Sequence, residues 1–231
     1  MKVNINGYIV PNDYKEVYDW FGIEAFCPND LKSIKVAAAE PLEVIIGTCY
    51  GGSIFAGSEI GAEIASHPHG ATIDIMGLAA SAASAIAMYA KNRMAPTAMI
   101  MVHNVSSVAE GDYHAMTKEA EILKQANAAI AAAYTMKSGM SLDDALKMMD
   151  KETWLTAAQA KEKGLVDEVM FETTDPAALV ATAGAGMIPR AVIEKTKEML
   201  AKLKAPVVPE PDDSGTYDLA YAKLNFINKT M

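Results

Sequence analysis

Residues Ile75–Ala90 have the sequence "IMGLAASAASAIAMYA", an apolar run interrupted by two serines, Ser81 and Ser84. The run follows a short strand-like segment at residues 71–75, and its alanine-rich second half predicts a helix over residues 80–91. Ser81 would then lie in the first turn of that helix, where unpaired backbone N–H groups favour a capping hydroxyl or a developing oxyanion. Ser84 would lie one turn further along. Two interpretations follow. Either both serines are structural residues at the start of a helix, or Ser81 is a nucleophile.

Strand-like and helix-like segments alternate on both sides of this stretch. Short apolar or alternating segments predict further strands at residues 3–10, 42–46, 98–102 and 166–170. Longer amphipathic segments predict helices at residues 14–21, 30–39, 54–66, 111–138, 141–149 and 157–163. Strand–helix–strand repetition with short connections predicts an α/β fold with a mostly parallel sheet.

The length of the chain allows one main domain. It has 231 residues, of which 51% are hydrophobic, enough for a sizeable core. We expect the α/β domain over residues 1–171 and a C-terminal appendage over residues 172–231. The appendage has a candidate helix at residues 191–203, a proline-rich linker at residues 205–215 and a tail without a clear pattern.

Charge and cysteine content restrict the class of protein. The formal net charge of −9 argues against binding to nucleic acid or to an anionic membrane surface. Cys27 and Cys49 are too few for a disulfide framework, so we expect a reducing compartment. The sequence shows neither a signal-peptide core nor an apolar stretch long enough to span a membrane. Together these features predict a cytoplasmic protein.

A histidine, His103, directly follows the predicted strand at residues 98–102. Parallel sheets place their chemistry in the loops at the carboxyl ends of strands. Because Ser81 follows the preceding predicted strand, the two side chains are expected to face each other across a cleft, with His103 as a general base. A structural histidine is the alternative.

The segment "YGGS", Tyr50–Ser53, follows another predicted strand and precedes a helix. Its glycines predict a turn whose backbone N–H groups join that of Ala82 in an oxyanion hole. An ordinary strand-to-helix turn is the alternative, because glycine pairs are common in such turns.

Four stretches, "GTCYGGSIFAGSEI", "DIMGLAASAASAIAMYA", "AMIMVHN" and "KETWLTAAQAKEKGLVDEV", together resemble the ClpP peptidase family. They are most similar to its phage-associated branch, the ClpP-like head maturation proteases. The resemblance runs in order from residue 3 to residue 170 and implies the ClpP/crotonase fold with a long projecting helix. It also implies a serine peptidase without metal or organic cofactor, a ring-shaped homo-oligomer and a polypeptide substrate. Further implied partners are a phage capsid or scaffold protein and an unfoldase.

The resemblance assigns roles residue by residue. Ser81, in "GLAAS", is implied as the nucleophile, and His103 is implied as the base. The implied oxyanion donors are Gly52 and Ala82, and the implied substrate-binding residues are Gly51 and Ser53.

The chain departs from the family's pattern at two places. The glycine turn is "TCYGG" where the family usually has N-S-P-G-G, which alters the expected binding of the substrate strand. The third catalytic residue is usually an aspartate just before an aromatic–Leu–Ser/Thr–Ala stretch. That stretch begins here at Trp154, and Glu152 occupies the position of the aspartate. Glutamate can orient a histidine as aspartate does. Asp150 is the alternative candidate for this role. If the segment has no catalytic role, it is a solvated surface turn.

Other candidate residues have weaker support. Cys49 precedes the glycine turn, which favours burial over a nucleophilic role. His67 and His69 have no nearby cysteine or further histidine, so no metal site is expected. Two other functions remain as alternatives. One is a crotonase-type enzyme that holds a thioester enolate with backbone N–H groups, and the other is an inactive assembly protein.

The predicted helix at residues 111–138 has a charged first half and an apolar, alanine-rich second half at residues 126–136. The apolar half is expected to pack on the domain's own sheet or on another subunit. The resemblance favours the subunit contact, with Ala129 and Ala133 in it.

Overall fold

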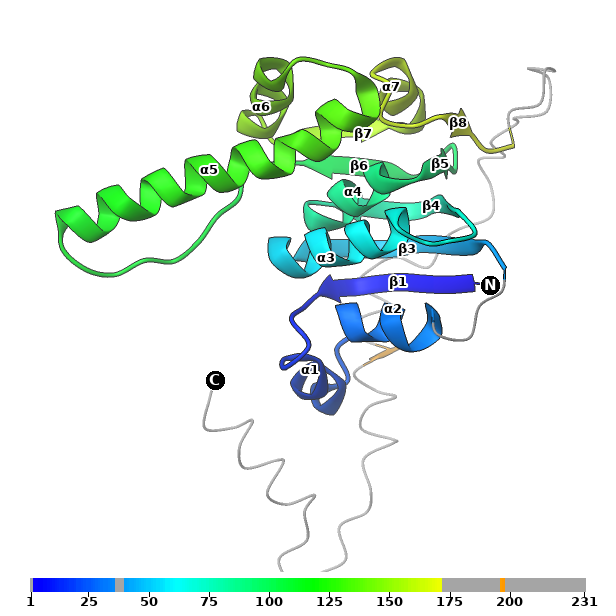
Figure 1. The fold of residues 1–231 in the computed structure, drawn as a ribbon, viewed down its shortest axis with the longest axis horizontal. Helices are drawn as coiled ribbons and strands as arrows, with labels where there is room; N and C mark the ends of the chain where they lie inside the picture. Colours follow the sequence, from blue (N-terminus) through cyan, green and yellow to red (C-terminus); the bar gives the residue numbers. More distant parts are fainter. Residues whose placement is uncertain (1, 36–39, 172–195, 198–231) are drawn as a thin grey trace, which may run out of the picture. The chain divides into compact units, whose positions relative to one another are not determined.

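The computed structural model describes residues 2–35, 40–171 and 196–197, and within these ranges eight strands form one sheet (Figure 1). The strands are β1 (Lys2–Ile9), β2 (Ala25–Phe26), β3 (Leu42–Gly52), β4 (Ala71–Ala80), β5 (Lys91–Met94), β6 (Met99–Val102), β7 (Thr153–Thr156) and β8 (Glu168–Val169). Their order is β2-β1-β3-β4-β5-β8, with β6 paired to β4 and β7 paired to β6. The β6–β7 pair is antiparallel and the other described pairs are parallel, which confirms the predicted fold class.

Strand β4 changes its partner halfway along its length. Its first half, from Thr72 to Ile75, pairs with β5, and its second half, from Leu78 to Ala80, pairs with β6. Ile73 and Ile75 are fully buried on one face of β4, whereas Thr72 and Met76 on the other face are exposed. The exchange brings the end of β4 beside the end of β6, where the predicted catalytic residues follow.

Helices cover the sheet and link its strands. They are α1 (Lys15–Phe21), α2 (Pro28–Lys35), α3 (Ile54–Ala65), α4 (Ala82–Ile86) with the 3-10 turn η1 (Ala87–Tyr89), α5 (Tyr113–Ser138), α6 (Leu142–Asp150) and α7 (Ala157–Glu162). Helices α3 and α4 pack on each other and on β3, and Figure 1 shows them in front of β3 and β4. The expected cap of α6 is confirmed, because the Ser141 hydroxyl accepts a hydrogen bond from the Asp144 N–H at 3.1 Å.

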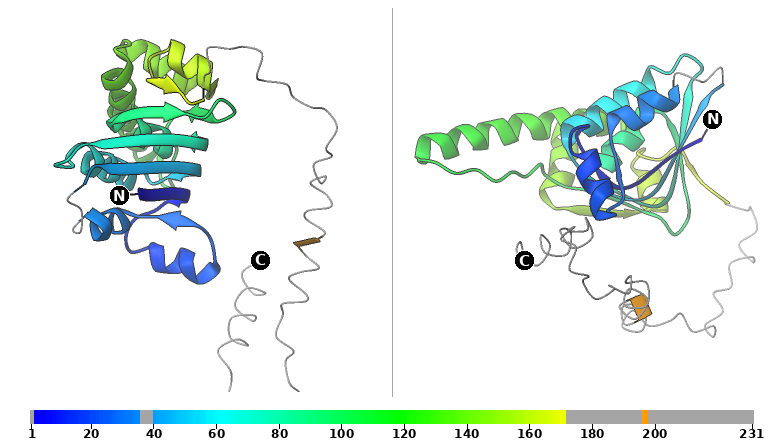
Figure 2. Two further views of the ribbon diagram at one scale, coloured as in Figure 1. Left: turned by 90° about the vertical axis from the view of Figure 1, so that its right-hand side faces the viewer. Right: turned by 90° about the horizontal axis from the view of Figure 1, so that it is seen from below.

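Helix α5 has 26 residues, and its N-terminal half extends beyond the rest of the domain (Figures 1 and 2). Its buried residues are Ala131, Ala133 and Tyr134, all in the C-terminal half. Ala129 and Ala133 line an apolar cavity of about 180 Å³ between α3, α4 and α5. Part of the apolar half therefore packs on its own domain, while Ala129 is exposed, and the expected subunit contact at these two alanines stays a prediction. The described helices include none long and apolar enough to cross a membrane.

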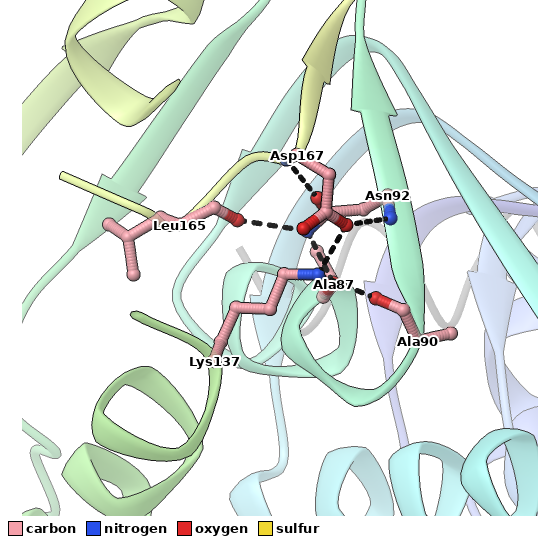
Figure 3. Close-up of polar contacts among 6 residues, drawn as sticks. All are labelled: Ala87, Ala90, Asn92, Lys137, Leu165 and Asp167. Carbon is pink, nitrogen blue, oxygen red and sulfur yellow. Dashed lines mark hydrogen bonds and ion pairs between the residues drawn. The ribbon is translucent and has the colours of Figure 1, made fainter. Parts of the chain in front are cut away.

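A polar network fixes the C-terminal end of α5 to the sheet (Figure 3). The Lys137 ammonium donates to the Asp167 carboxylate at 2.5 Å and to the carbonyl of Ala90 at 3.0 Å. The same carboxylate accepts the N–H of the fully buried Asn92 at 2.7 Å. The Asn92 amide group donates to the carbonyls of Ala87 and Leu165.

Several expected boundaries were wrong. Strand β3 continues to Gly52 and β4 continues to Ala80, where we expected strands ending at Ile46 and Ile75. The expected helix over residues 80–91 is shorter, because α4 and η1 end at Tyr89 and are followed by β5. Strands β2, β5 and β7 were not predicted. Apart from Thr196 and Lys197, which are helical, the expected appendage with its helix and linker lies outside the described residues. The domain division stays a prediction.

Candidate active site

Ser81 links the end of β4 to the start of α4 in a strained conformation. Its backbone angles are φ 55° and ψ −124°. Non-glycine residues rarely adopt a positive φ, and such a residue costs on the order of 1–3 kcal/mol. Its N–H donates to the carbonyl of Met101 on β6 at 2.9 Å, which helps to hold the turn in place. Ser81 therefore precedes the helix. The expectation that it lies in the first turn was wrong.

His103 follows β6, and its side chain lies against Ser81. Its Nε2 atom is 2.8 Å from the Ser81 hydroxyl oxygen, a hydrogen-bond distance. The parallel register of β4 and β6 pairs Ala80 with Met101, so the two residues leave the sheet at the same edge. The structure thus brings together the two side chains that the sequence placed at neighbouring strand ends.

Gly51 and Gly52 end β3 and do not form the expected separate turn. Gly51 has φ +84°, and a Cβ atom there would lie 2.6 Å from the Cβ of Ser81 and 2.9 Å from the nitrogen of Ala82. Gly52 has φ +139°, and its Cβ would lie 2.3 Å from the carbonyl oxygen of Ile9. Only glycine fits at either position. The backbone of Gly51 lies directly against the serine as a result.

Ala82 and Ser53 occupy different places around this edge. Ala82 is the first residue of α4, so its N–H has no partner within that helix. Ser53 caps α3, since its hydroxyl accepts a hydrogen bond from the N–H of Ala56 at 3.3 Å.

Two carboxylates lie at the end of α6 and just after it, and each is hydrogen-bonded to another residue. Glu152 has φ 46° and accepts a hydrogen bond from the Trp154 indole at 3.3 Å. Asp150 accepts a hydrogen bond from the side-chain amide of Asn104 at 2.9 Å. No hydrogen bond joins His103 to either carboxylate in the described part of the chain. Catalytic hydrogen bonds often tighten only with substrate bound, so this geometry leaves the third catalytic residue as a choice between the two.

The other candidate nucleophiles are buried. Ser84 has no exposed surface, and its hydroxyl lies 2.6 Å from the Ser81 carbonyl oxygen and 2.8 Å from the Tyr134 hydroxyl. Cys49 is also fully buried, and burial raises the pKa of its thiol to about 11. A thiol with such a pKa stays protonated at neutral pH, whereas the thiolate is the nucleophilic form. Both residues therefore have a structural role and are not nucleophiles.

The histidines outside this edge form no metal site. His67 is buried, and its Nδ1 accepts the N–H of His69 at 3.4 Å. Across the described residues, no group of three or more His, Cys, Asp or Glu side chains could hold a metal ion. His114 packs on the ring of Tyr113 at the exposed start of α5.

A pocket of about 230 Å³ contains the Ser81–His103 pair. Gly51 and Gly52 form one side of it, and the loop after His103 forms another. Tyr8 and Tyr50 also line it. The sequence analysis missed Tyr8, which lies far from the catalytic motifs in sequence. It noted Tyr50 only as part of the glycine segment and gave it no role of its own.

Comparisons with known proteins agree on one family. Residues 34–173 match the family model described as Clp protease. The ATP-dependent Clp protease proteolytic subunit 1 of Chlamydia abortus is 31% identical over 146 residues, which span 59% of this chain and 73% of that protein. Subunit 2 of Corynebacterium diphtheriae is 32% identical over 129 residues, or 54% of this chain and 65% of that protein. A solved structure of a ClpP1 mutant from Listeria monocytogenes has a TM-score of 0.59 and 22% identity, and covers 73% of this chain and 90% of its own.

Proposed function

This chain belongs to the Clp protease family, and we propose that it is a serine endopeptidase with Ser81 as its nucleophile. The observation that carries the proposal is the 2.8 Å contact between the Ser81 hydroxyl and His103 Nε2. A serine becomes nucleophilic when an adjacent base takes its proton, and this contact provides that base. The strained backbone of Ser81 supports the same role, because strained residues concentrate at functional sites.

The reaction begins with attack of the Ser81 oxygen on a peptide carbonyl carbon. His103 Nε2 accepts the hydroxyl proton as the new C–O bond forms, and then delivers it to the leaving amine as the C–N bond breaks. A water molecule next attacks the acyl-enzyme. His103 takes a proton from this water and returns it to Ser81 as the ester bond breaks.

Backbone N–H groups stabilise the charge that develops on the carbonyl oxygen. We assign this role to Gly52 and Ala82, which flank the serine from β3 and from the start of α4. Donors fixed in place before the reaction need no reorganisation when the oxyanion forms. Gly51 and the backbone of Ser53 provide the edge along which the substrate strand binds, since no side chain at Gly51 could be accommodated there.

A carboxylate completes the proposed triad by orienting His103. Glu152 takes this role, because it stands where the family's pattern has an aspartate, and Asp150 is the alternative. Glu152 is exposed, and its carboxylate accepts a hydrogen bond from the Trp154 indole at 3.3 Å. The proposed role requires that it exchange this contact for one to His103.

The biological setting is proposed from the sequence resemblance. We place the chain in a ring-shaped homo-oligomer in the cytoplasm, with the active sites facing an enclosed space. Its polypeptide substrate is a phage capsid or scaffold protein, and an unfoldase is a candidate partner. The exposed N-terminal half of α5 supports assembly, because its apolar side chains Met116 and Ile122 remain 39% and 44% exposed in the described domain.

Labelling with a fluorophosphonate probe tests the proposal. An activated serine reacts with this probe, so wild-type protein should label and should cleave an unfolded protein such as casein. A crotonase-type enzyme or an inactive assembly protein would not label. His103→Ala should abolish both signals, while His114→Ala, a control at the exposed start of α5, should keep both. Wild-type protein that neither labels nor cleaves would contradict the proposal.

A further inference from the structure

The loop that follows His103 covers residues 104–111 and contains no helix or strand. It runs alongside α5 and leads to the projecting start of that helix (Figures 1 and 2). Within the described part of the chain, no backbone–backbone hydrogen bond holds these residues. Backbone N–H and C=O groups are the usual anchors of a protein segment, so the position of this loop depends on its contacts with side chains.

Side chains of two helices hold the loop. The Val105 N–H donates a hydrogen bond to the side-chain oxygen of Asn127 on α5 at 2.7 Å. The Asn104 side-chain amide donates to the Asp150 carboxylate at the end of α6 at 2.9 Å. A third contact, nearer the start of α5, joins exposed side chains. Of the three, the contact with Asn127 is half-buried and fixes a backbone group, so it is the firmest anchor of the loop.

Asn127 is a polar residue in the apolar, alanine-rich half of α5. It precedes the buried residues Ala131 and Tyr134 by four and seven positions, so it lies on the same face of the helix. Asparagine is a weak helix former, and a half-buried amide costs free energy unless it is hydrogen-bonded. The contact with Val105 offsets that cost. An amide at this position therefore serves the loop and does not serve the helix.

The C-terminal half of α5 gives Asn127 a firm support. Hydrogen bonds of Tyr134 and Lys137 join this half of the helix to α4 and to the segments that lead into β5 and β8. Val105, which Asn127 holds, lies two residues after His103 and lines the same pocket. A displacement of a reacting group by about 1 Å can cost roughly 100-fold in rate, so the support of this loop matters for the chemistry.

We propose that Asn127 is a positioning residue of the active site, which holds the Val105 N–H and thereby keeps His103 at hydrogen-bond distance from Ser81. The inference rests on the proposed peptidase function and adds to it a residue of α5 that acts through the loop. Without the Asn127 oxygen, the loop spends part of its time in positions that displace His103, and the reaction slows in proportion. Loss of the partner of a half-buried N–H is expected to slow it by about 5- to 100-fold.

A matched pair of substitutions at Asn127 tests the acceptor oxygen. Asn127→Asp keeps an oxygen at the same place, and Asn127→Leu replaces the amide with an apolar side chain of similar size. The measurements are the rate of fluorophosphonate labelling and the hydrogen exchange of the Val105 amide, with urea unfolding to show that each variant is folded. Asn127→Leu should label about 5- to 100-fold more slowly and exchange the Val105 amide faster. Asn127→Asp should stay within about threefold of wild type in both measurements.

Controls separate this inference from the proposed function. Gln125→Leu makes a comparable amide-to-leucine change at an exposed position of α5, and it should label like wild type. If folded Asn127→Leu labels as fast as wild type, or if Asn127→Asp and Asn127→Leu slow labelling equally, the inference is wrong and the peptidase function stands. The same holds if the slower labelling of Asn127→Leu only follows its unfolded fraction. If wild type neither labels nor cleaves, both fail.

Discussion

The hydroxyl of Ser84 lies 2.8 Å from the hydroxyl of Tyr134, which joins α4 to α5 inside the domain. Both side chains are buried, and burial raises the pKa of Tyr134 to about 12 although the Ser84 hydrogen bond lowers it. Ser84 is thus a structural residue, while Ser81, three positions earlier, contacts His103. The two serines of the same apolar stretch have different tasks.

This difference predicts opposite effects of two substitutions. Ser81→Ala should abolish fluorophosphonate labelling with little loss of stability. Ser84→Ala should keep labelling but lower the free energy of unfolding by about 1–3 kcal/mol, because the buried Tyr134 hydroxyl loses its partner. Mass spectrometry of the labelled protein and urea unfolding provide the two measurements. Labelling that survives Ser81→Ala and disappears in Ser84→Ala would overturn the assignment.

Gly51→Ala should eliminate labelling. The new Cβ would lie 2.6 Å from the Cβ of Ser81, so the serine or the end of β3 must move. Gly22→Ala is the matched control, since Gly22 has a similar φ of +70° with no atom within 4 Å of the added Cβ. Both variants carry roughly 1–2 kcal/mol of backbone strain, and only Gly51→Ala also has the clash. Equal labelling of the two variants would show that the close approach of Gly51 to Ser81 is unimportant.

The third catalytic residue can be identified with charge-neutral substitutions. Loss of the orienting carboxylate of a triad costs about 10⁴ in turnover. Glu152→Gln should therefore be severely impaired in peptide cleavage, and Asp150→Asn should be close to wild type. The opposite ranking would assign the role to Asp150, whose contact with Asn104 places it near His103. Mild effects of both would indicate a Ser81–His103 dyad.

The network at the end of α5 predicts a pH-dependent contribution to stability. Burial alone would raise the pKa of Asp167, but hydrogen bonds from Lys137 and from the Asn92 N–H outweigh it, so the pKa lies below its ordinary value of 3.8. A carboxyl whose pKa is lowered by folding stabilises the fold above its ordinary pKa and loses this effect as the pH falls through its folded pKa.

Asp167→Asn should therefore be less stable than wild type at pH 7, and the difference should shrink as the pH falls below about 4. Urea unfolding at a series of pH values measures it. Asp143→Asn is the control, because Asp143 pairs with Lys147 on the exposed surface of α6 and such pairs contribute little. A pH-independent difference between wild type and Asp167→Asn would contradict the assigned role of the charge.

The sequence predicted the fold class and both residues of the Ser81–His103 pair, because hydrophobic periodicity and strand ends are local properties. It failed at "GLAA", residues 77–80, which the alanine content assigned in part to a helix. Pairing of β4 with β3 and β6 outweighs that local preference. The positive φ of Ser81 was also unpredictable, since serine has no special tendency toward it. Tyr8 reaches the site only through the β1–β3 register, which no local pattern encodes.

The exposed half of α5 gives the last prediction, on assembly. Ile122 is 44% exposed and Met116 is 39% exposed on a helix end that extends away from the domain. An isolated helix end has little stability of its own in water, so contact with another subunit would bury its exposed apolar side chains, which the domain does not. Ile122→Lys should weaken the proposed homo-oligomer and lower cleavage of casein with it. Thr117→Lys adds the same charge at an exposed position that is neither three nor four residues from Met116 or Ile122, so it faces another way and should assemble normally. Light scattering at micromolar concentration measures the mass of each protein. A wild-type monomer with full peptidase activity would refute assembly through α5.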